Sequence, residues 1–589
     1  MVYDCRMEKF DSRLKMILYF LKGCKRYFIA FLFFACLMSL FDLIPPQIIS
    51  FTVDSVLDSN QNPWIKEHLY VVSLLVIGVA LLGAIWRYLF RYFNSKGAEK
   101  LVHRMRNTLF DHLMHLPYGW YSQNQTGDLI QRCTSDVEQI KTFLAEQLTT
   151  LFRVILLVSL ALYFMFSIDG KMALCALAFI PIIVGYSILF YRGIANQFEK
   201  VDIEEGRLSN IAQENLTGVR VVRAFGKEMS ERKKFEKQNK EYTALWVHLM
   251  RLMALFWTSS DLFSYLQVIV VLCVGVWQCV NGNITAGEFI AFNSYTAMII
   301  WPIRSLGRVI SNLSKAGISI DRLRYIMNAE VEVDSSDARD IDMYQDITFD
   351  HVCFKYENST KNILDDVSFK IEAGKTVGIL GATGSGKSTL MYLLDRLYDV
   401  SSGNIYVGDT NLKDIRLDCV RKNIGIVLQE PYLFSRTLEE NIRIADEGVS
   451  HEDVLAATKI AALESTISHF QNGFETYIGE RGVTLSGGQK QRTAIAQMLV
   501  RNADIMIFDD SLSAVDANTD QDIRTSLSKV KKECTTLLIA HRITTLMDAD
   551  LILVLDHGKI VQQGNHKSLL KEDGIYKRIY ELQSRNCGG

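Results

Sequence analysis

The sequence predicts an α-helical membrane domain followed by a soluble α/β domain. Six strongly apolar runs occur within the first 310 residues, and no comparable run follows them. From residue 347 onward, short strand-like runs alternate with helical stretches, which is typical of a largely parallel sheet covered by helices. We therefore expect a membrane domain over residues 1–327, a linker over 328–343 and the α/β domain over 344–589.

Each apolar run, together with its mildly polar flanks, is long enough to cross a bilayer as a helix. About 20 apolar residues match the roughly 30 Å hydrocarbon core of a membrane. The prediction is therefore six transmembrane helices. The six runs are residues 29–41, 69–86, 154–166, 172–191, 262–280 and 284–303.

The distribution of Lys and Arg predicts that both termini face the cytoplasm. The stretch before the first run and the long second and fourth connections are basic, whereas the other connections are short. Basic connections tend to stay on the cytoplasmic side. The long connections, residues 96–142 and 193–250, contain few Pro and Gly, so we expect the membrane helices to continue well into the cytoplasm.

Overall composition argues against several classes of protein. The 589 residues carry a formal charge of −2, so a basic surface that binds nucleic acid is not expected. The eleven cysteines show no Cys-x-x-Cys spacing, which argues against a zinc site and a disulfide framework.

A glycine-rich loop in the α/β domain predicts a site for the phosphates and magnesium ion of ATP. Residues 381–388, GATGSGKS, fit the pattern G-x-x-x-x-G-K-[ST], with a strand before them and an apolar helix after them. Backbone N–H groups of such a loop surround phosphate. We expect Lys387 to neutralise the β- and γ-phosphates and Ser388 to hold Mg²⁺. The expected contacts to ATP are Gly381, Ala382, Thr383, Gly384, Ser385, Gly386, Lys387, Ser388 and Thr389.

Two aspartates follow a buried strand farther along the chain. Asp509 comes directly after the run DIMIF, where a carboxylate at the carboxyl end of a strand reaches the magnesium shell. Its alternative role is a helix N-cap. Between the phosphate loop and this aspartate, residues 485–489 read LSGGQ and precede a helix.

With these three motifs in this order, the α/β half resembles the nucleotide-binding domain of ATP-binding cassette (ABC) transporters. In that family, LSGGQ is the signature sequence, which completes the ATP site of the opposite subunit. The membrane half resembles that of exporters, and a membrane domain placed first in the same chain favours export. The resemblance implies that a partner's ATP is contacted by Ser486, Gly487, Gly488 and Gln489.

The resemblance also implies roles for four single residues. Tyr356 corresponds to the aromatic residue that stacks on adenine. Gln429 corresponds to the glutamine that touches Mg²⁺ and takes part in catalysis, and His541 to the switch histidine that contacts the γ-phosphate. Asp516 corresponds to the last residue of the D-loop, which also contributes to the nucleotide site.

Asp510 departs from the family pattern. Exporters usually have glutamate after the metal-binding aspartate, where it orients or activates the attacking water. The shorter side chain withdraws the carboxylate by about 1.5 Å, and a misplacement of about 1 Å can slow an enzyme roughly a hundredfold. We therefore expect a catalytically degenerate site that still binds ATP.

Because its own site is predicted to be slow but its signature is complete, we expect the chain to be half of a heterodimer. The chain resembles one subunit of a bacterial heterodimeric multidrug exporter, and we expect it in the plasma membrane. The partner would carry the missing glutamate and a degenerate signature. The alternatives are a homodimeric lipid or peptide exporter, and a regulatory ATP-binding subunit or gate without pump activity.

Ionisable residues near membrane depth give the only hint of a substrate. Asp42, Asp261 and Arg304 lie in or beside apolar runs that also carry tryptophan and tyrosine. Such charges are costly in a membrane unless they are paired or hydrated. One interpretation is a cavity for amphipathic compounds, including cationic ones, and the other is packing between helices and contact with membrane lipids.

Overall fold

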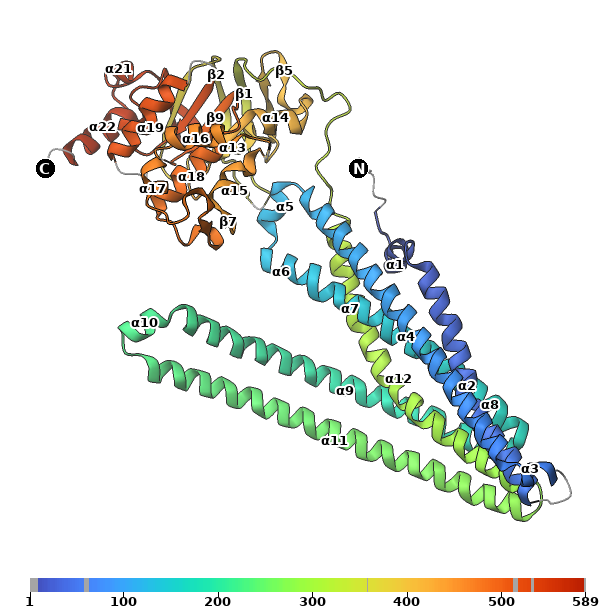
Figure 1. Ribbon diagram of the computed structural model, residues 1–589. Coiled ribbons are helices and arrows are strands. Elements are labelled where there is room, and N and C mark those ends of the chain that lie inside the picture. Colours follow the sequence, from blue (N-terminus) through green and yellow to red (C-terminus); the bar gives the residue numbers. More distant parts are fainter. Residues whose placement is uncertain are drawn as a thin grey trace. The chain divides into compact units, whose positions relative to one another are not determined.

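The computed structural model describes residues 9–57, 63–357, 359–446, 448–511, 517–530 and 534–586. The chain divides into two compact units. One contains Met1–Leu116 and Asn124–Glu330, and the other contains Pro117–Gln123 together with Val331–Gly589. Figure 1 shows that the first unit is built of helices, whereas the second also contains strands.

The first unit consists mainly of long helices, and each predicted apolar run falls on a different one of them. The long helices are α2 (Lys25–Leu57), α4 (Leu69–Met114), α8 (Leu148–Ile168), α9 (Gly170–Thr217), α11 (Glu228–Val280) and α12 (Ala286–Met327). The shorter helices are α1 (Arg13–Leu21), α3 (Pro63–Glu67), α6 (Thr126–Gln131), η1 (Arg132–Asp136), α7 (Val137–Thr142), η2 (Phe143–Gln147) and α10 (Val219–Ala224).

Five spans in this unit are long and apolar enough to cross a membrane, counted over the described residues only. The sixth apolar run lies in α12, where Glu288 and Asn293 make the segment less apolar. These helices confirm the predicted helical membrane domain. The five spans are Lys25–Leu57, Leu69–Met114, Thr126–Ile168, Gly170–Thr217 and Glu228–Val280.

Several of these helices are much longer than a bilayer requires. Helices α4, α9 and α11 contain 46, 48 and 53 residues, whereas about 20 residues span the hydrocarbon core. The extra turns correspond to the long polar connections of the sequence. Figure 1 shows α9 and α11 side by side as a hairpin with α10 at its tip.

Interhelical contacts in the first unit use both apolar and charged side chains. Phe292 and Tyr295 of α12 are completely buried, and the Tyr295 hydroxyl donates to the carbonyl oxygen of Leu43 in α2 at 3.1 Å. Arg87 of α4 pairs with Asp42 of α2 at 2.9 Å. Arg304 of α12 pairs with Asp261 of α11 at 2.7 Å. Each carboxylate predicted to lie near membrane depth is therefore neutralised by an arginine on a neighbouring helix.

Two sheets form the framework of the second unit. A four-stranded antiparallel sheet has the order β2-β1-β4-β5, and a six-stranded sheet has the order β12-β11-β3-β10-β9-β6. In the larger sheet only β12 runs antiparallel to its neighbour, which confirms the predicted, largely parallel α/β domain. The strands are β1 (Ile347–Phe354), β2 (Leu364–Ile371), β3 (Thr376–Gly381), β4 (Ser402–Val407), β5 (Thr410–Asn411), β6 (Ile424–Val427), β9 (Ile505–Asp509), β10 (Thr535–Ile539), β11 (Leu551–Asp556) and β12 (Lys559–Gly564), with a separate pair β7 (Arg436–Thr437) and β8 (Tyr477–Ile478).

Helices and the second sheet cover the larger sheet. The helices of this unit are α5 (Tyr118–Gln123), α13 (Lys387–Leu394), α14 (Leu417–Asn423), α15 (Leu438–Ile442), α16 (His451–Ile460), α17 (Glu464–Ser468), α18 (Gly487–Leu499), α19 (Ala517–Val530), α20 (Ile543–Leu546), α21 (His566–Leu569) and α22 (Ile575–Asn586). The 3₁₀ turns are η3 (Leu412–Asp414), η4 (Arg443–Ala445), η5 (Gly473–Glu475) and η6 (Glu480–Gly482).

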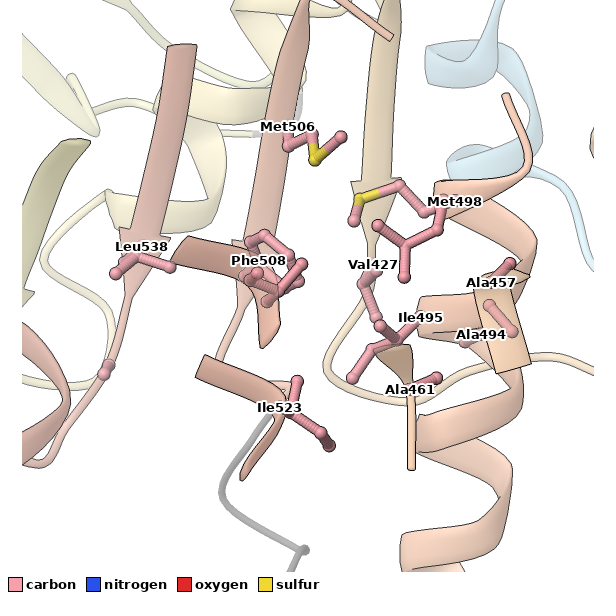
Figure 2. Packing of buried hydrophobic residues seen from close by; sticks show 14 of the residues in the cluster. Val427, Ala457, Ala461, Ala494, Ile495, Met498, Met506, Phe508, Ile523 and Leu538 are labelled. Carbon is pink, nitrogen blue, oxygen red and sulfur yellow. The ribbon is translucent and has the colours of Figure 1, made fainter. Parts of the chain in front are cut away.

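Strand β9, between β10 and β6, is buried on both faces. Successive side chains of a strand point to opposite sides of the sheet, and those of β9 belong alternately to two apolar clusters. Ile507 lies in one cluster, whereas Met506 and Phe508 lie in the other. Figure 2 shows Met506 and Phe508 together with Met498 of α18. A strand buried in this way has little freedom to shift, so it fixes the residues that follow it.

One buried carboxyl group in this unit makes stability depend on pH. Asp395 ends α13, and burial raises its pKa to about 7, although Arg421 and Arg501 oppose the shift. In the unfolded chain an aspartate ionises near pH 4. The folded protein is therefore expected to lose stability as the pH rises from about 4 to about 7.

Replacement of Asp395 by Asn should remove this pH dependence, because the amide resembles the protonated carboxyl group. We expect the melting temperature of Asp395→Asn, relative to that of the unchanged protein, to rise between about pH 4 and about pH 7. Thermal unfolding of the full-length protein in detergent measures the difference. A difference that stays constant across this range contradicts the assignment.

Candidate nucleotide site

Four adjacent parallel strands bring the candidate residues to one edge of the sheet. The order β3-β10-β9-β6 places the glycine-rich loop after β3, His541 after β10, Asp509 and Asp510 at the end of β9, and Gln429 after β6. Ligands of open α/β sheets bind at the carboxyl ends of the strands. Residues that are far apart in the sequence therefore converge at one site.

The glycine-rich loop has a backbone shape that other residues do not fit. A Cβ atom on Gly381 would lie 2.4 Å from the carbonyl oxygen of Leu555, which is too close for any real contact. Gly384 and Gly386 have φ angles of +81° and +104°, in the left-handed region that favours glycine. The outer residues of the loop, Ala382, Thr383 and Gly384, are exposed.

Lys387 begins α13 and is almost completely buried beneath this loop. Its Nζ atom donates to the carbonyl oxygens of Gly381 and Ala382, both at 2.9 Å, and the residue is 7% exposed. Burial lowers the pKa of Lys387, while the nearby carboxylates of Asp509 and Asp510 act in the opposite direction. The ammonium group of Lys387 is therefore within electrostatic range of both carboxylates.

Asp509 lies beside the start of α13 in a similarly buried position. It is 5% exposed, and burial raises its pKa, while a hydrogen bond from the Ser388 side chain opposes that shift. The Ser385 hydroxyl is also buried and has no hydrogen-bond partner among the described residues. Because buried polar groups normally have hydrogen-bond partners, the Ser385 hydroxyl is available to a ligand of the loop.

These residues fit MgATP as a ligand. Phosphate oxygens beside Lys387 would stabilise its charged form, and a divalent cation beside Asp509 and Ser388 would stabilise the ionised carboxylate. Hard cations prefer such oxygen ligands.

Asp510 is held tightly by its backbone. Its φ angle is +44°, a conformation that few residues other than glycine adopt, although aspartate is among the more tolerant. Its N–H donates to the carbonyl oxygen of Ile539, at the end of β10, at 3.0 Å. The preceding strand is buried throughout, so its packing and this hydrogen bond fix the backbone position of Asp510.

Tyr356 lies in an aromatic cluster that was only partly predicted. Its hydroxyl is 3.1 Å from the Thr389 hydroxyl, and its ring packs edge-on against Phe354 and Tyr398 at 4.9 and 5.2 Å between centroids. Thr389 is thus engaged in holding the tyrosine. Tyr398 also packs against Tyr118 of α5 at 5.6 Å, a contact for which the sequence offers no local signal.

Gln429 and His541 are both exposed, and glutamines from other helices hold their backbones. The Gln429 carbonyl oxygen accepts a hydrogen bond from Gln491 of α18 at 3.3 Å. The His541 carbonyl oxygen accepts one from Gln583 of α22 at 2.7 Å. Sequence reasoning missed both partners, because a single glutamine on a helix carries no recognisable pattern.

The signature residues form the start of α18, in a different part of this unit. Ser486 and Gln489 make a capping box, in which the Ser486 hydroxyl accepts from the Gln489 N–H at 3.3 Å and the Gln489 side chain accepts from the Ser486 N–H at 2.9 Å. Gly488 belongs to the first turn. A Cβ atom on Gly487 would meet nothing within 4 Å in the part of the chain that the structure describes, so packing within this chain does not explain that glycine. Asp516 lies outside the described residues.

Comparisons with known proteins cover nearly the whole chain. The family model described as ABC transporter transmembrane region matches residues 28–303, and the model described as ABC transporter matches residues 364–513. The chain is similar to the uncharacterized ABC transporter ATP-binding protein YknU of Bacillus subtilis (strain 168), with 34% identity over 98% of each chain.

Relatives with more specific names are similar over most of their length. The probable multidrug resistance ABC transporter ATP-binding/permease protein YheI of Bacillus subtilis is 33% identical over 93% of each chain. The ATP-dependent lipid A-core flippase of Pseudomonas aeruginosa is 32% identical over 90% of this chain and 88% of its own. The structure of a bacterial Atm1-family ABC exporter with ATP bound matches with a TM-score of 0.82 and 26% identity, over 95% of this chain and 98% of the other.

The position of Tyr356 predicts how substitutions affect nucleotide affinity. Tyr356→Phe keeps the ring and loses only the contact with Thr389, so ATP affinity should stay within about threefold. Tyr356→Ala removes the stacking surface and should weaken binding about tenfold. Titration of the full-length protein with a fluorescent ATP analogue measures both. Equal losses in the two variants would mean that the ring does not stack on adenine.

Proposed function

Because the chain belongs to the ABC transporter family, we propose that it is one half of an exporter that moves amphipathic compounds out of the cell by alternating access. The protein is a multi-pass membrane protein with an ABC ATPase domain. Support for export comes from similarity to bacterial exporters over nearly the full length. We place it in a bacterial plasma membrane with both termini in the cytoplasm, on the basis of its basic connections.

The convergence of residues at the edge of the larger sheet carries this proposal. Bound MgATP supplies the phosphoanhydride bond whose hydrolysis drives transport. Lys387 and the loop backbone would bind and orient the phosphates, and Ser388, Asp509 and Gln429 would hold the metal ion. Tyr356 would stack on the base, and His541 would contact the γ-phosphate.

We infer that this site hydrolyses ATP slowly. The Asp510 carboxylate is about 1.5 Å shorter in reach than that of a glutamate. A backbone shift that restored this reach would break the hydrogen bond between Asp510 and Ile539 and disturb the buried end of β9. An attacking water is therefore held too loosely for efficient activation, while the groups that bind ATP are intact.

The complete signature supports an unequal pair of subunits. The exposed capping box at the start of α18 offers an N-terminal helix end to an anionic ligand. The lack of neighbours around Gly487 among the described residues fits a glycine whose neighbours belong to another subunit. A heterodimer uses both features, because this signature then serves an efficient site built on the partner.

The membrane helices support an amphipathic substrate. Trp257 of α11 and Trp301 of α12 stack at 5.8 Å, and Trp301 is 61% exposed. Asp261 is paired with Arg304, so it provides no unbalanced negative charge for a cation. The names of relatives include both a multidrug transporter and a lipid flippase, and lipids remain the second candidate substrate class.

Lengthening the Asp510 side chain tests the slow site. Asp510→Glu should accelerate ATP hydrolysis by the purified full-length chain between about tenfold and about a hundredfold, because it restores the reach of the carboxylate. Asp548→Glu makes the same change at an exposed aspartate and should leave the rate unchanged. Brisk hydrolysis by the unchanged chain alone, or no gain in Asp510→Glu, contradicts a degenerate site.

Transport against a gradient distinguishes a pump from a regulated gate. In inside-out vesicles that contain this chain and its partner, ATP should drive accumulation of a fluorescent amphipathic dye above its external concentration. A non-hydrolysable ATP analogue should not support accumulation. Equilibration without accumulation would favour the gate.

A further inference from the structure

We propose that Gln583, on the C-terminal helix α22, positions the switch histidine His541 for ATP hydrolysis. This inference rests on the proposed role of His541 at the γ-phosphate. The Gln583 Nε2 atom donates to the carbonyl oxygen of His541 at 2.7 Å, and its Oε1 atom accepts from the N–H of Ile543 at 2.9 Å. One side-chain amide thus holds the backbone on both sides of Arg542.

The second of these bonds replaces a missing helix cap. Ile543 is the first residue of α20, and the preceding Arg542 makes no side-chain capping bond in the described structure. The first N–H groups of a helix have no partner within the helix. Gln583 supplies one from a distant helix, so the turn that carries His541 depends on α22 for its shape.

Helix α22 is anchored well enough to serve this purpose. Tyr576, in its first turn, is completely buried. The Tyr576 hydroxyl is 2.7 Å from Nδ1 of His566, and its N–H donates to the side chain of Gln562 at 3.1 Å. These contacts fix the start of the helix, and its regular geometry then places Gln583 beside the turn.

The other side of the same turn is held by α19. Arg524 donates to the carbonyl oxygen of Thr544 at 2.9 Å and is ion-paired with Asp520. The segment after β10 is therefore tied to two helices, and Gln583 makes the contact nearest to His541. Its loss leaves α20 attached through Arg524 but frees the carbonyl group of the histidine itself.

A change in the position of His541 should affect the chemical step more than ATP binding. We assign His541 to the γ-phosphate, which reacts, whereas Lys387 and Tyr356 are assigned to contacts that bind ATP before the reaction. We expect Gln583→Ala to slow hydrolysis about tenfold, with half-saturation by ATP changed less than about twofold, because small displacements of reacting groups are costly. Gln583→Glu keeps the acceptor but loses the donor, and should give an intermediate loss.

The test is a double-mutant cycle measured by single-turnover ATP hydrolysis with the full-length chain in excess over ATP. The variants are Gln583→Ala, Gln583→Glu, His541→Ala and the double variant of His541→Ala with Gln583→Ala. Glu581→Ala changes an exposed residue of the same helix and serves as the matched control. Because Gln583 acts through His541, Gln583→Ala should slow the His541→Ala protein less than about twofold further.

Melting temperatures identify variants that fail to fold. If Gln583→Ala is unstable, the nearly isosteric Gln583→Glu is used in its place.

Three outcomes overturn the positioning role. They are full activity in both Gln583 variants, an equal loss in Glu581→Ala, and losses that multiply when Gln583→Ala and His541→Ala are combined, as a purely structural effect would produce. Full activity in His541→Ala would instead refute the assignment of that histidine in the proposed function, and the role of Gln583 in hydrolysis with it.

Discussion

The parallel alignment of β3, β10, β9 and β6 is the constraint on which the nucleotide site depends. Because these strands are neighbours and run in the same direction, the segments that follow them meet at one edge. The apolar clusters on both faces hold the strands in register. The core thus positions the loop with Lys387, the carboxylate of Asp509 and the turn with His541. Because the core is rigid, a movement of the backbone cannot easily compensate for the shorter side chain at position 510.

The aromatic cluster around Tyr398 links the proposed adenine-binding tyrosine with helix α5. Tyr398 touches Tyr356, which we assign to adenine, and also Tyr118 of α5. Along the chain, α5 follows the long helix α4 and precedes α6, both of which belong to the helical unit. The Tyr356 ring is therefore linked through Tyr398 to a segment whose neighbours in the sequence belong to that unit. The turn after β10 is contacted by two other helices, through Gln583 of α22 and Arg524 of α19.

Much of this architecture could be predicted, because it depends on local patterns. The apolar runs predicted the long helices, and the glycine pattern between a strand and a helix predicted the loop before α13. The alternation of strands and helices predicted the parallel sheet. The left-handed conformation of Asp510, the partner of Asp261 and the contacts of Tyr398 and Gln583 could not be predicted, because each depends on residues far away in the sequence. The contact between the hydroxyl groups of Thr389 and Tyr356 could not be predicted either, because a threonine after the loop suggests only a contact with phosphate.

We propose that this chain binds ATP at its own site without cleaving it efficiently, and that a different subunit supplies the active site. The most direct test of this claim is to supply radiolabelled ATP to the purified two-subunit complex, remove free nucleotide rapidly during turnover and identify what stays bound. We expect each pair of chains to retain a single intact ATP, bound by the loop with Lys387, while the other site contains ADP or is empty. Complexes that retain only ADP, or that lose ATP equally from both sites, would contradict the claim.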